Sequence, residues 1–272
     1  MPIEIKPLTE INDFNQCETL QRLVWGGGDL GITPTHFFVA SSHSGGLVLG
    51  AFVGAELIGF LNGFPAYLPE NLSENLSEKR APLGFHSDMM AVLPEYRGQG
   101  IGKKLKWRQR DWCLARSLSW ISWTFDPLQR KNARLNFEHL GVSVYEYRVN
   151  EYGELGGSLN GDLPTDRLLA HWDLLSKRVT MLANGVADTF SSKPSYALRS
   201  AKNKPTELKL ELSAEHIMVA TPESLNELLV KDKALALEWR LAVREVMQTY
   251  LAKGYIVRRF VDSAYILSKD RQ

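Results

Sequence analysis

The sequence predicts a mixed α/β fold in which helices and strands alternate through the first half of the chain. Apolar runs of strand length recur between residues 46 and 149, and glycine or proline separates them from stretches with helical spacing of apolar side chains. From residue 11 to residue 149 the predicted order is helix, hairpin, strand, helix, strand, helix, strand. Such alternation favours a sheet flanked by helices.

The predicted elements of the first half follow one another closely. They are a helix over 11–25 ended by Gly26-Gly27-Gly28, hairpin strands over 46–53 and 56–64 around the turn Gly54-Ala55, a polar loop over 69–82, a strand over 85–92, a helix over 101–117 and a strand over 120–125. The last strand is almost entirely apolar, as expected where both faces of a sheet are covered.

A further helix is predicted to begin at Asp126. The Asp126 carboxylate would cap the helix, Pro127 suits the first helical position, and Gln129 would complete a variant of the capping box. Gly141 would end this helix, and the alternating residues 142–149 predict the next strand.

The second half of the chain has a looser pattern. Residues 183–207 are rich in Ser, Lys, Asn, Gly and Pro and predict a long connection. A strand over 216–220, one helix from Thr221-Pro222-Glu223 to Gly254, and a hairpin over 255–260 and 264–267 are predicted to follow it. We therefore predict a domain over 1–150 and a C-terminal strand–helix–hairpin extension over 151–272, packed on the same sheet or continuing it.

Composition narrows the class of protein. The chain has 272 residues, of which 44% are apolar and 23% charged, enough for a packed core. Its net charge of +1 provides no basic field for nucleic acid or an anionic membrane, and no apolar run approaches the ~20 residues of a membrane helix. Cys17 and Cys113 are too few for a disulfide framework, and the N-terminus lacks a signal-peptide pattern. We expect a cytoplasmic protein with no nucleic-acid or membrane partner, and a homodimer stays open.

A glycine-rich segment connects the strand over 85–92 to the helix that follows it. It comprises Arg97, Gly98, Gln99, Gly100, Ile101, Gly102 and Lys103. At such a place the amides are the unpaired N-terminal donors of the helix, the helix dipole adds roughly half a positive charge, and glycine lets a phosphate approach the backbone. With the cationic Arg97, Lys103 and Lys104, the segment predicts a pyrophosphate-binding turn.

Spacing separates this segment from two other phosphate-binding motifs. A Walker loop has glycine where Arg97 stands and Ser or Thr where Lys104 stands, and the dinucleotide fingerprint has Gly-x-Gly-x-x-Gly. The segment matches Arg-x-x-Gly-x-Gly instead, through Arg97, Gly100 and Gly102.

Residues 92–102 resemble the acyl-CoA-binding motif of the GNAT superfamily of N-acyltransferases. Asn132-Ala133 and the run Phe137 to Val142 are similar to the helix and following strand of that family, as is the order of elements up to about residue 150. Residues 123–128 and 164–168 resemble, more narrowly, a bacterial subgroup of about this length. The resemblance implies a GNAT-like mixed, mostly antiparallel sheet flanked by helices.

The resemblance also implies how acyl-CoA would be held, with no metal. In the family, the strand before the glycine turn splays away from the strand after the helix, which leaves backbone groups near Met90, Ala91 and Val92 to hold the pantetheine arm. The pyrophosphate would rest on residues 97–103, and Asn132 would approach the cofactor from its helix, although a surface role for Asn132 fits equally well.

Two residues are candidates for the base that deprotonates the acceptor amine. His86 and Asp88 stand two apart on the strand over 85–92, so they share one face. Family members often carry an acidic base at about this place, and histidine titrates near neutral pH. A structural His–Asp hydrogen bond is the alternative.

The sequence departs from the family at the general acid. Many members protonate the leaving thiolate with a tyrosine at the position of Phe137, which has no proton to donate. Three explanations stay open: the thiolate leaves unprotonated, Tyr145 or Tyr147 supplies the proton, or the site has lost catalysis.

Asp166-Arg167 is a second open feature. The pair could form an ion pair at the start of a helix, or Arg167 could bind a substrate carboxylate through its guanidinium group.

The function that the sequence predicts is CoA-dependent N-acyl transfer to a small amine, for example an amino acid. Acetyl-CoA is the expected donor, and a short dicarboxylic donor such as succinyl-CoA is an alternative. A non-catalytic acyl-CoA-binding or sensing protein is the second hypothesis, because of Phe137. A protein N-acetyltransferase is the third, since residues 151–272 could recognise a partner as well as cover a small-molecule pocket.

Overall fold

The structure is a computed structural model that describes residues 2–26, 31–68, 82–153 and 163–269. The loop expected over 69–82 lies outside these ranges except for Pro82, as do Gly27 and Gly28. The chain divides into two compact units. The first contains the described residues up to Trp123 together with 173–175, and the second contains the described residues from Thr124 onward apart from those three.

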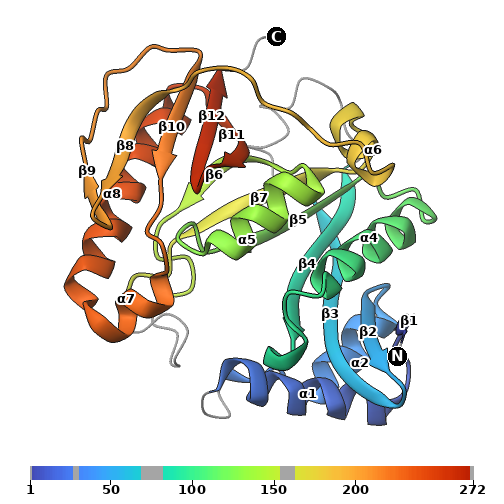
Figure 1. Cartoon of the computed structure of the whole chain (residues 1–272). Coiled ribbons are helices and arrows are strands. Elements are labelled where there is room, and N and C mark those ends of the chain that lie inside the picture. The colour runs from blue at the N-terminus through green and yellow to red at the C-terminus, as the bar shows by residue number, and fades with distance from the viewer. Residues whose placement is uncertain (1, 27–30, 69–81, 154–162, 270–272) are drawn as a thin grey trace. The chain divides into compact units, whose positions relative to one another are not determined.

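The first unit combines a five-stranded sheet with helices. Its elements are β1 (Ile3–Pro7), α1 (Ile11–Trp25), α2 (Thr35–His43), β2 (Leu47–Val53), β3 (Glu56–Tyr67), β4 (Leu83–Val92), the 3₁₀ turn η2 (Pro94–Tyr96), α4 (Ile101–Leu114) and the first four residues of β5 (Trp120–Phe125). The strands follow the order β1-β2-β3-β4-β5, with antiparallel pairs except for the parallel pair β4–β5 (Figure 1).

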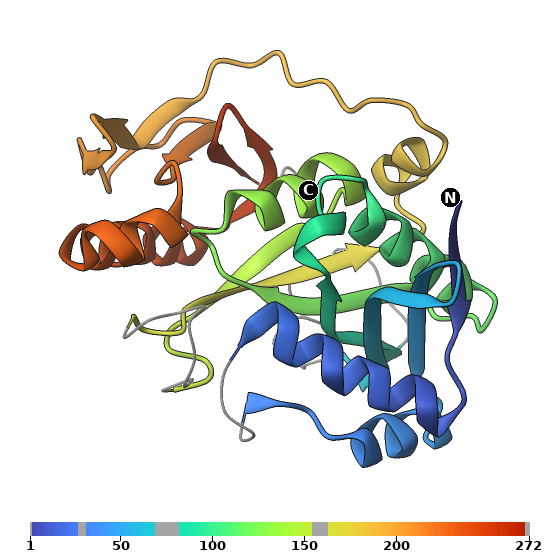
Figure 2. The same ribbon diagram turned by 60° about the horizontal axis from the view of Figure 1, so that its bottom comes forward.

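Helices cover both faces of this sheet. Asn62 of β3 is bonded to Ser41 of α2, whereas a Cβ atom on the neighbouring Gly63 would lie 3.1 Å from the side chain of Gln109 on α4. Because successive residues of a strand face opposite sides, α2 and α4 cover opposite faces. Helix α1 packs beside α2 (Figure 2), and the rings of Phe14 and Phe38 stack 6.1 Å apart between these two helices.

The second unit is also built from a sheet and helices. Its elements are α5 (Arg130–Arg134), the π-helix η3 (Leu135–Leu140), β6 (Ser143–Arg148), β7 (Arg167–Asp173), α6 (Lys177–Ala183), β8 (Ser195–Ala201), β9 (Lys204–Thr206), β10 (His216–Ala220), α7 (Leu225–Lys231), α8 (Lys233–Ala252), β11 (Tyr255–Val261) and β12 (Ala264–Lys269). The strand order is β7-β6-β11-β12-β10-β8-β9, and β8 and β10 are the parallel neighbours.

The C-terminal hairpin extends the sheet of this unit, because β11 pairs with β6 through Val257 and Val144. The apolar stripe of α8 packs against the sheet, and Trp239, Val243, Val246 and Tyr250 are all fully buried. The mixed, mostly antiparallel fold class is confirmed. The functional boundary at residue 150 stays a prediction, since the compact units divide at Trp123 instead.

Local signals failed at Asp126. The helix begins only at Arg130, with Gln129 as its N-cap residue and no side-chain cap, so the prediction that Asp126 caps it is wrong. The Asp126 carboxylate accepts a hydrogen bond from the Leu128 amide. It also forms a bidentate ion pair with Arg240 on α8. Because Arg240 is far from Asp126 in the chain, the residues around Asp126 do not reveal this ion pair.

Most other differences lie in the second half. The long connection expected over 183–207 contains β8 and β9, and the single helix expected from Thr221 to Gly254 is divided at Asp232, whose side chain caps α8. Strands β1 and β7 and helices α2 and α6 were not predicted. None of the helices in the described part of the chain combines the length and apolarity that crossing a bilayer requires.

Candidate functional site

The glycine turn joins η2 to α4, and at two of its positions the backbone adopts a conformation that favours glycine. Gly98 has φ +81° and Gly100 has φ +75°, and Gly100 is the N-cap residue of α4. A Cβ atom at either position would meet no atom within 4 Å. These glycines are therefore set by backbone conformation rather than by crowding, and the space beside them is open to a ligand.

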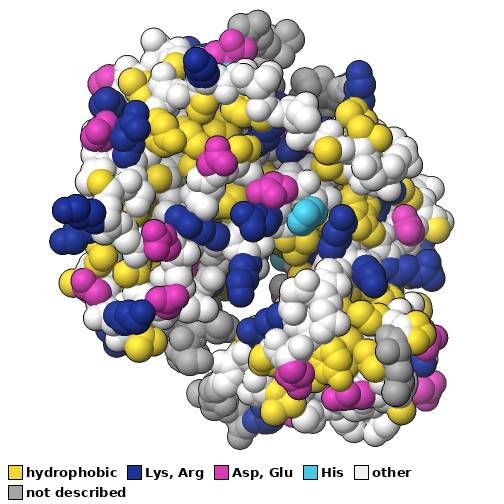
Figure 3. Space-filling view, viewed as in Figure 1, with side chains coloured by type: hydrophobic (Ala, Val, Ile, Leu, Met, Phe, Trp, Pro, Cys, Tyr) yellow, Lys and Arg dark blue, Asp and Glu magenta, His cyan; other side chains and the backbone are white. Residues whose placement is uncertain are grey.

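The turn presents donors and positive charge to that open space. Lys104 donates its amide to the Gly100 carbonyl at 3.0 Å, and the amides before it have no acceptor within the helix. Arg97, Gln99, Lys103 and Lys104 are exposed, Gly102 is half-buried, and Ile101 is buried beneath the turn. Figure 3 shows Lys and Arg side chains gathered over α4. The turn thus has the donor set and charge that a pyrophosphate needs.

Strand β4 pairs with β3 along most of its length and with β5 on its other side near its start. Its pairs with β5 are Phe85–Ile121 and His86–Ser122. Farther along, Met90, Ala91 and Val92 pair with β3 on the other side, opposite Leu61, Phe60 and Gly59. Arg97 reaches back from the glycine turn and donates Nε to the Val92 carbonyl at 3.1 Å. This arrangement is compatible with the predicted role of residues 90–92, which stays a prediction.

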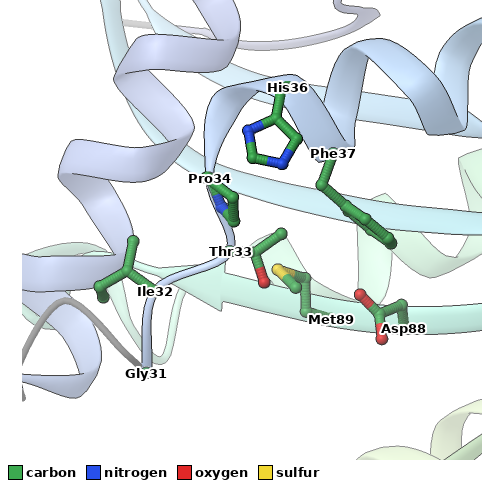
Figure 4. Close-up of a pocket in the computed structure, with 8 residues that line it drawn as sticks. All are labelled: Gly31, Ile32, Thr33, Pro34, His36, Phe37, Asp88 and Met89. Carbon is green, nitrogen blue, oxygen red and sulfur yellow. The ribbon is translucent and has the colours of Figure 1, made fainter.

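A β-bulge interrupts the β3–β4 ladder beside these residues. Asn62 pairs with Met89 and Phe64 with His86, so two steps along β3 match three along β4. In a regular strand Asp88 and Met89 would face opposite sides, but here both line one pocket, and Figure 4 shows their side chains on the same side of β4. The bulge is therefore what brings Asp88 and Met89 into one site.

This pocket has a volume of about 370 Å³ and lies in the first unit. Strand β4 contributes two of its residues, and the segment before and at the start of α2 contributes the others. The lining comprises Gly31, Ile32, Thr33, Pro34, His36, Phe37, Asp88 and Met89 (Figure 4). One carboxylate, one imidazole and a mainly apolar wall suit a small molecule that carries an amino group.

Asp88 and His86 have different surroundings. Although Asp88 meets solvent, loss of hydration against the surrounding protein raises the pKa of its carboxyl, and a hydrogen bond from Asn62 opposes that rise. His86 Nδ1 lies 3.0 Å from Ser122 Oγ, and its ring lies 5.6 Å from that of Phe64. The described contacts thus connect His86 to β3 and β5, whereas Asp88 lines the pocket.

Sequence reasoning missed His36, the second titratable residue in the pocket lining. The residue was overlooked because α2 was not predicted. The signal that could have revealed this helix is Pro34 followed by Thr35 and the apolar run Phe37-Phe38-Val39-Ala40, which is a helix start.

The second unit contains the remaining predicted residues. Asn132 is exposed on α5. Phe137 is fully buried in η3, and its ring lies 6.1 Å from that of Phe125 and 5.7 Å from that of Tyr265. Tyr145 packs edge-on against His171 at 6.3 Å.

Tyr147 and Asp166 belong to a buried polar network. The Tyr147 hydroxyl donates to Asp166 Oδ2 at 2.6 Å, and burial, then the neighbouring carboxylate, raises the pKa of the phenol. Arg244 donates to both Asp166 oxygens, at 2.8 and 2.9 Å. The helix start expected at Asp166-Arg167 is therefore wrong: Arg167 begins strand β7, donates Nη1 to the Asp166 carbonyl at 2.9 Å and lies 3.8 Å from Asp126 Oδ2.

Metal ligands are not grouped in the described ranges, where no cluster of three or more His, Cys, Asp or Glu side chains could hold an ion. Within the described ranges, the open glycine turn brings together backbone donors, cations and open space, which are the features by which a helix N-terminus can bind a phosphate group.

The chain is similar to a family model and to several solved structures. The model of the acetyltransferase (GNAT) family matches residues 14–141. No curated protein matches the chain by sequence. Among solved structures, the chain is similar to the ribosomal-protein-S18-alanine N-acetyltransferase of Escherichia coli (14% identity, 64% of this chain and 94% of that one, TM-score 0.47). It is also similar to Naa20 of Chaetomium thermophilum (17%, 62% and 86%, TM-score 0.47) and to the IAA acetyltransferase of Bacillus cereus (15%, 63% and 99%, TM-score 0.45).

Proposed function

From the premise that residues 14–141 of this chain belong to the acetyltransferase (GNAT) family, we propose that the protein transfers an acyl group from a CoA thioester to the amino group of a small molecule. The observation that carries the proposal is the open glycine turn at the start of α4, where Gly98 and Gly100 leave the helix amides accessible. Acetyl-CoA is the donor we expect, and succinyl-CoA is the alternative to test beside it.

Three groups of residues in this chain are proposed to bind the donor. Residues 97–103 would hold the pyrophosphate through helix amides and cations, and the backbone of residues 90–92 would hold the pantetheine arm. Asn132 is a further candidate contact. When bound, the thioester supplies an electrophilic carbonyl and a thiolate leaving group.

The acceptor amine must lose a proton before it can attack, because an ammonium nitrogen has no lone pair. We assign this proton to Asp88, directly or through a water molecule, since its carboxylate lines the pocket and the pKa of its carboxyl is raised. His86 is the second candidate base, with its Nδ1 beside Ser122. The amide of Met90 or Val92 is the donor that we propose for the carbonyl oxygen as negative charge develops on it.

The leaving thiolate has no obvious acid. Phe137 has no hydroxyl, and burial, followed by the bond to Asp166, raises the pKa of the Tyr147 phenol. A thiol with a pKa near ~8.5 leaves tolerably as the thiolate. We therefore propose departure without direct protonation, with Tyr145 as the alternative donor.

A second function follows from one observation. The fully buried Phe137 ring packs against Phe125 and Tyr265, where family members that use an acid carry a tyrosine. A protein that binds acyl-CoA without consuming it would have no use for that acid, so a binding or sensing role is the competing proposal.

Two assays on the purified chain distinguish these functions. The first records thiol release while acetyl-CoA and succinyl-CoA are crossed with amino acids, monoamines, polyamines, aminoglycosides and a peptide with a free N-terminus. The second records the Tm shift caused by CoA. We expect a Tm increase with CoA and thiol release with at least one small amine.

The outcomes separate the hypotheses. A Tm increase without thiol release from any acceptor supports the binding protein, and release with the peptide alone supports a protein N-acetyltransferase. We expect Asp88→Asn to lower kcat at least ~100-fold, because the loss of a general base typically costs 10²–10⁴-fold. Thiol release that persists in both Asp88→Asn and His86→Gln would refute the assignment of the base.

A further inference from the structure

The bulge that places Asp88 in the pocket is bordered by a buried amide on the neighbouring strand. Asn62 of β3 is 0% exposed, and its Nδ2 donates to Asp88 Oδ2 at 3.4 Å, the long end of the hydrogen-bond range. Burying an amide costs free energy unless its polar atoms are hydrogen-bonded, so the NH₂ group and the oxygen of a buried asparagine each need a hydrogen-bond partner. Asp88 is one of those partners.

Ser41 on α2 is the other. Its hydroxyl lies 3.3 Å from both Asn62 Oδ1 and the Gly63 carbonyl, and it is itself buried. When the hydroxyl donates to Oδ1, the amide has one favourable orientation, in which its NH₂ group faces Asp88. If the amide were flipped, a carbonyl oxygen would face the carboxylate and the two acceptors would repel. Ser41 therefore selects the orientation that favours a charged Asp88.

We propose that Asn62, oriented by Ser41, is the positioning residue that directs the Asp88 carboxylate into the pocket and favours its charged form. The inference rests on the proposed function, because it concerns the same base. Asn62 acts through Asp88 and does not line the pocket, so it is not itself catalytic.

Two influences on Asp88 oppose each other. Loss of hydration against the surrounding protein raises the pKa of its carboxyl, and the hydrogen bond from Asn62 lowers it. Without the amide, the carboxylate would keep the first influence and lose the second. The base would then be protonated over a wider range of acidic pH.

Other titratable groups lie on β4 itself and on the helices α1 and α2 that pack beside it. His36 lines the same pocket from α2, and His86 lies two residues away on β4 beside Ser122. On α1, Glu18 accepts hydrogen bonds from both the amide and the hydroxyl of Thr35 at the start of α2. None of these side chains is altered in the variants compared below, so a difference between those variants in the acidic limb of a pH–rate profile reports on Asp88.

The test is the pH dependence of kcat/KM for thiol release in wild type, Asn62→Leu and Ser41→Ala. We expect the acidic limb of Asn62→Leu to move upward by roughly one pH unit, because a hydrogen bond to a charged group is lost. Ser41→Ala should move it in the same direction by less. In an Asp88→Asn background, Asn62→Leu should change the rate by less than twofold, since the two residues act as a pair.

Gln109→Leu is the matched control. It also removes a buried amide from the first unit, but Gln109 is on α4, bonds Lys106 rather than Asp88, and has an Nε2 atom without a hydrogen-bond partner. Its acidic limb should coincide with that of wild type. If Asn62→Leu does not fold, the test rests on Ser41→Ala, because that variant keeps the amide in place. An acidic limb of Ser41→Ala that coincides with that of wild type would then refute the inference.

A second readout does not depend on turnover. Carbon-13 NMR of the aspartate carboxyl groups, with the Asp88 signal assigned by Asp88→Asn, should show Asp88 titrating at higher pH in Asn62→Leu. If that shift occurs in a protein that releases no thiol with any acceptor, the proposed function fails while the Asn62 inference stands. If wild type is active and neither the NMR titration nor the acidic limb moves in Asn62→Leu, the Asn62 inference is wrong.

Discussion

Arg240 and Asp126 form a buried, doubly hydrogen-bonded ion pair in the second unit. Arg240 Nη1 donates to Asp126 Oδ1 at 2.9 Å and Nη2 to Oδ2 at 2.7 Å, with the two side chains 0% and 7% exposed. The pair joins α8 to the segment between β5 and α5, across 114 positions of sequence. Removing one partner would leave the other charge buried without compensation.

We therefore expect Asp126→Ala to lower the free energy of unfolding by about 3–5 kcal/mol, measured by urea denaturation. The control is Glu227→Ala, which breaks an exposed pair with Lys231 and should cost less than about 1 kcal/mol. Equal losses in the two variants would show that burial does not govern the strength of the Asp126 pair.

The glycine turn leads to a prediction about affinity. Alanine at position 100 must adopt φ +75°, a left-handed conformation that costs a side-chain-bearing residue about 1–2 kcal/mol, and its methyl group would occupy the open space beside the amides. We expect Gly100→Ala to weaken CoA binding at least about tenfold by calorimetry. Gly254→Ala is the control, since Gly254 has φ +79° and equally open surroundings but follows α8 rather than preceding a helix. A similar loss of affinity in both variants would refute the phosphate role.

Lys106 leads to a prediction about pH. Its Nζ is buried, donates to Ser87 Oγ at 2.7 Å and lies 3.7 Å from the centre of the Trp123 ring. Burial holds the pKa of Lys106 well below its ordinary value in the folded protein. Between that pKa and the unfolded value near ~10.4, the unfolded chain binds the extra proton, so the folded state loses stability as pH falls.

Lys106→Met removes this proton uptake. The stability of wild type relative to Lys106→Met should therefore fall as pH decreases from 10, with a slope of at most about 1.4 kcal/mol per pH unit, and level off below the folded pKa. Urea denaturation at several pH values measures the difference. Parallel stability curves for the two proteins would mean that Lys106 stays charged in the folded protein.

Phe137 leads to a prediction about the missing acid. Phe137→Tyr places a hydroxyl inside a fully buried cluster with Phe125 and Tyr265. An unpartnered buried hydroxyl costs about 1–3 kcal/mol, so the variant should be less stable and no faster in thiol release. Phe190→Tyr is the control, because that ring is half-buried and its hydroxyl can reach solvent. A faster Phe137→Tyr would show that an acid at this position still helps the leaving group.

Local sequence signals predicted the elements that they encode directly. The hairpin of β2 and β3, the strand–glycine–helix unit of β4 and α4, the C-terminal stop at Gly141 and the closing hairpin of β11 and β12 all lie where alternation, helical spacing and glycine placed them. The geometry of the glycine turn was predictable for the same reason, because it is set within a few consecutive residues, and its pyrophosphate role stays a prediction.

The tertiary structure determined the contacts between residues that are far apart in the chain. Asp126 looks like a helix cap until Arg240 binds it, and β8 lies in a polar stretch yet gains a parallel neighbour in β10. Asp88 enters a pocket with His36 because one extra residue in β4 re-aims it and Asn62 of β3 bonds its carboxylate. The sequence by itself determined where a phosphate could be bound, since backbone amides and glycines act locally. The pocket, the placement of Asp88 in it and the buried ion pairs depended on contacts that only folding creates.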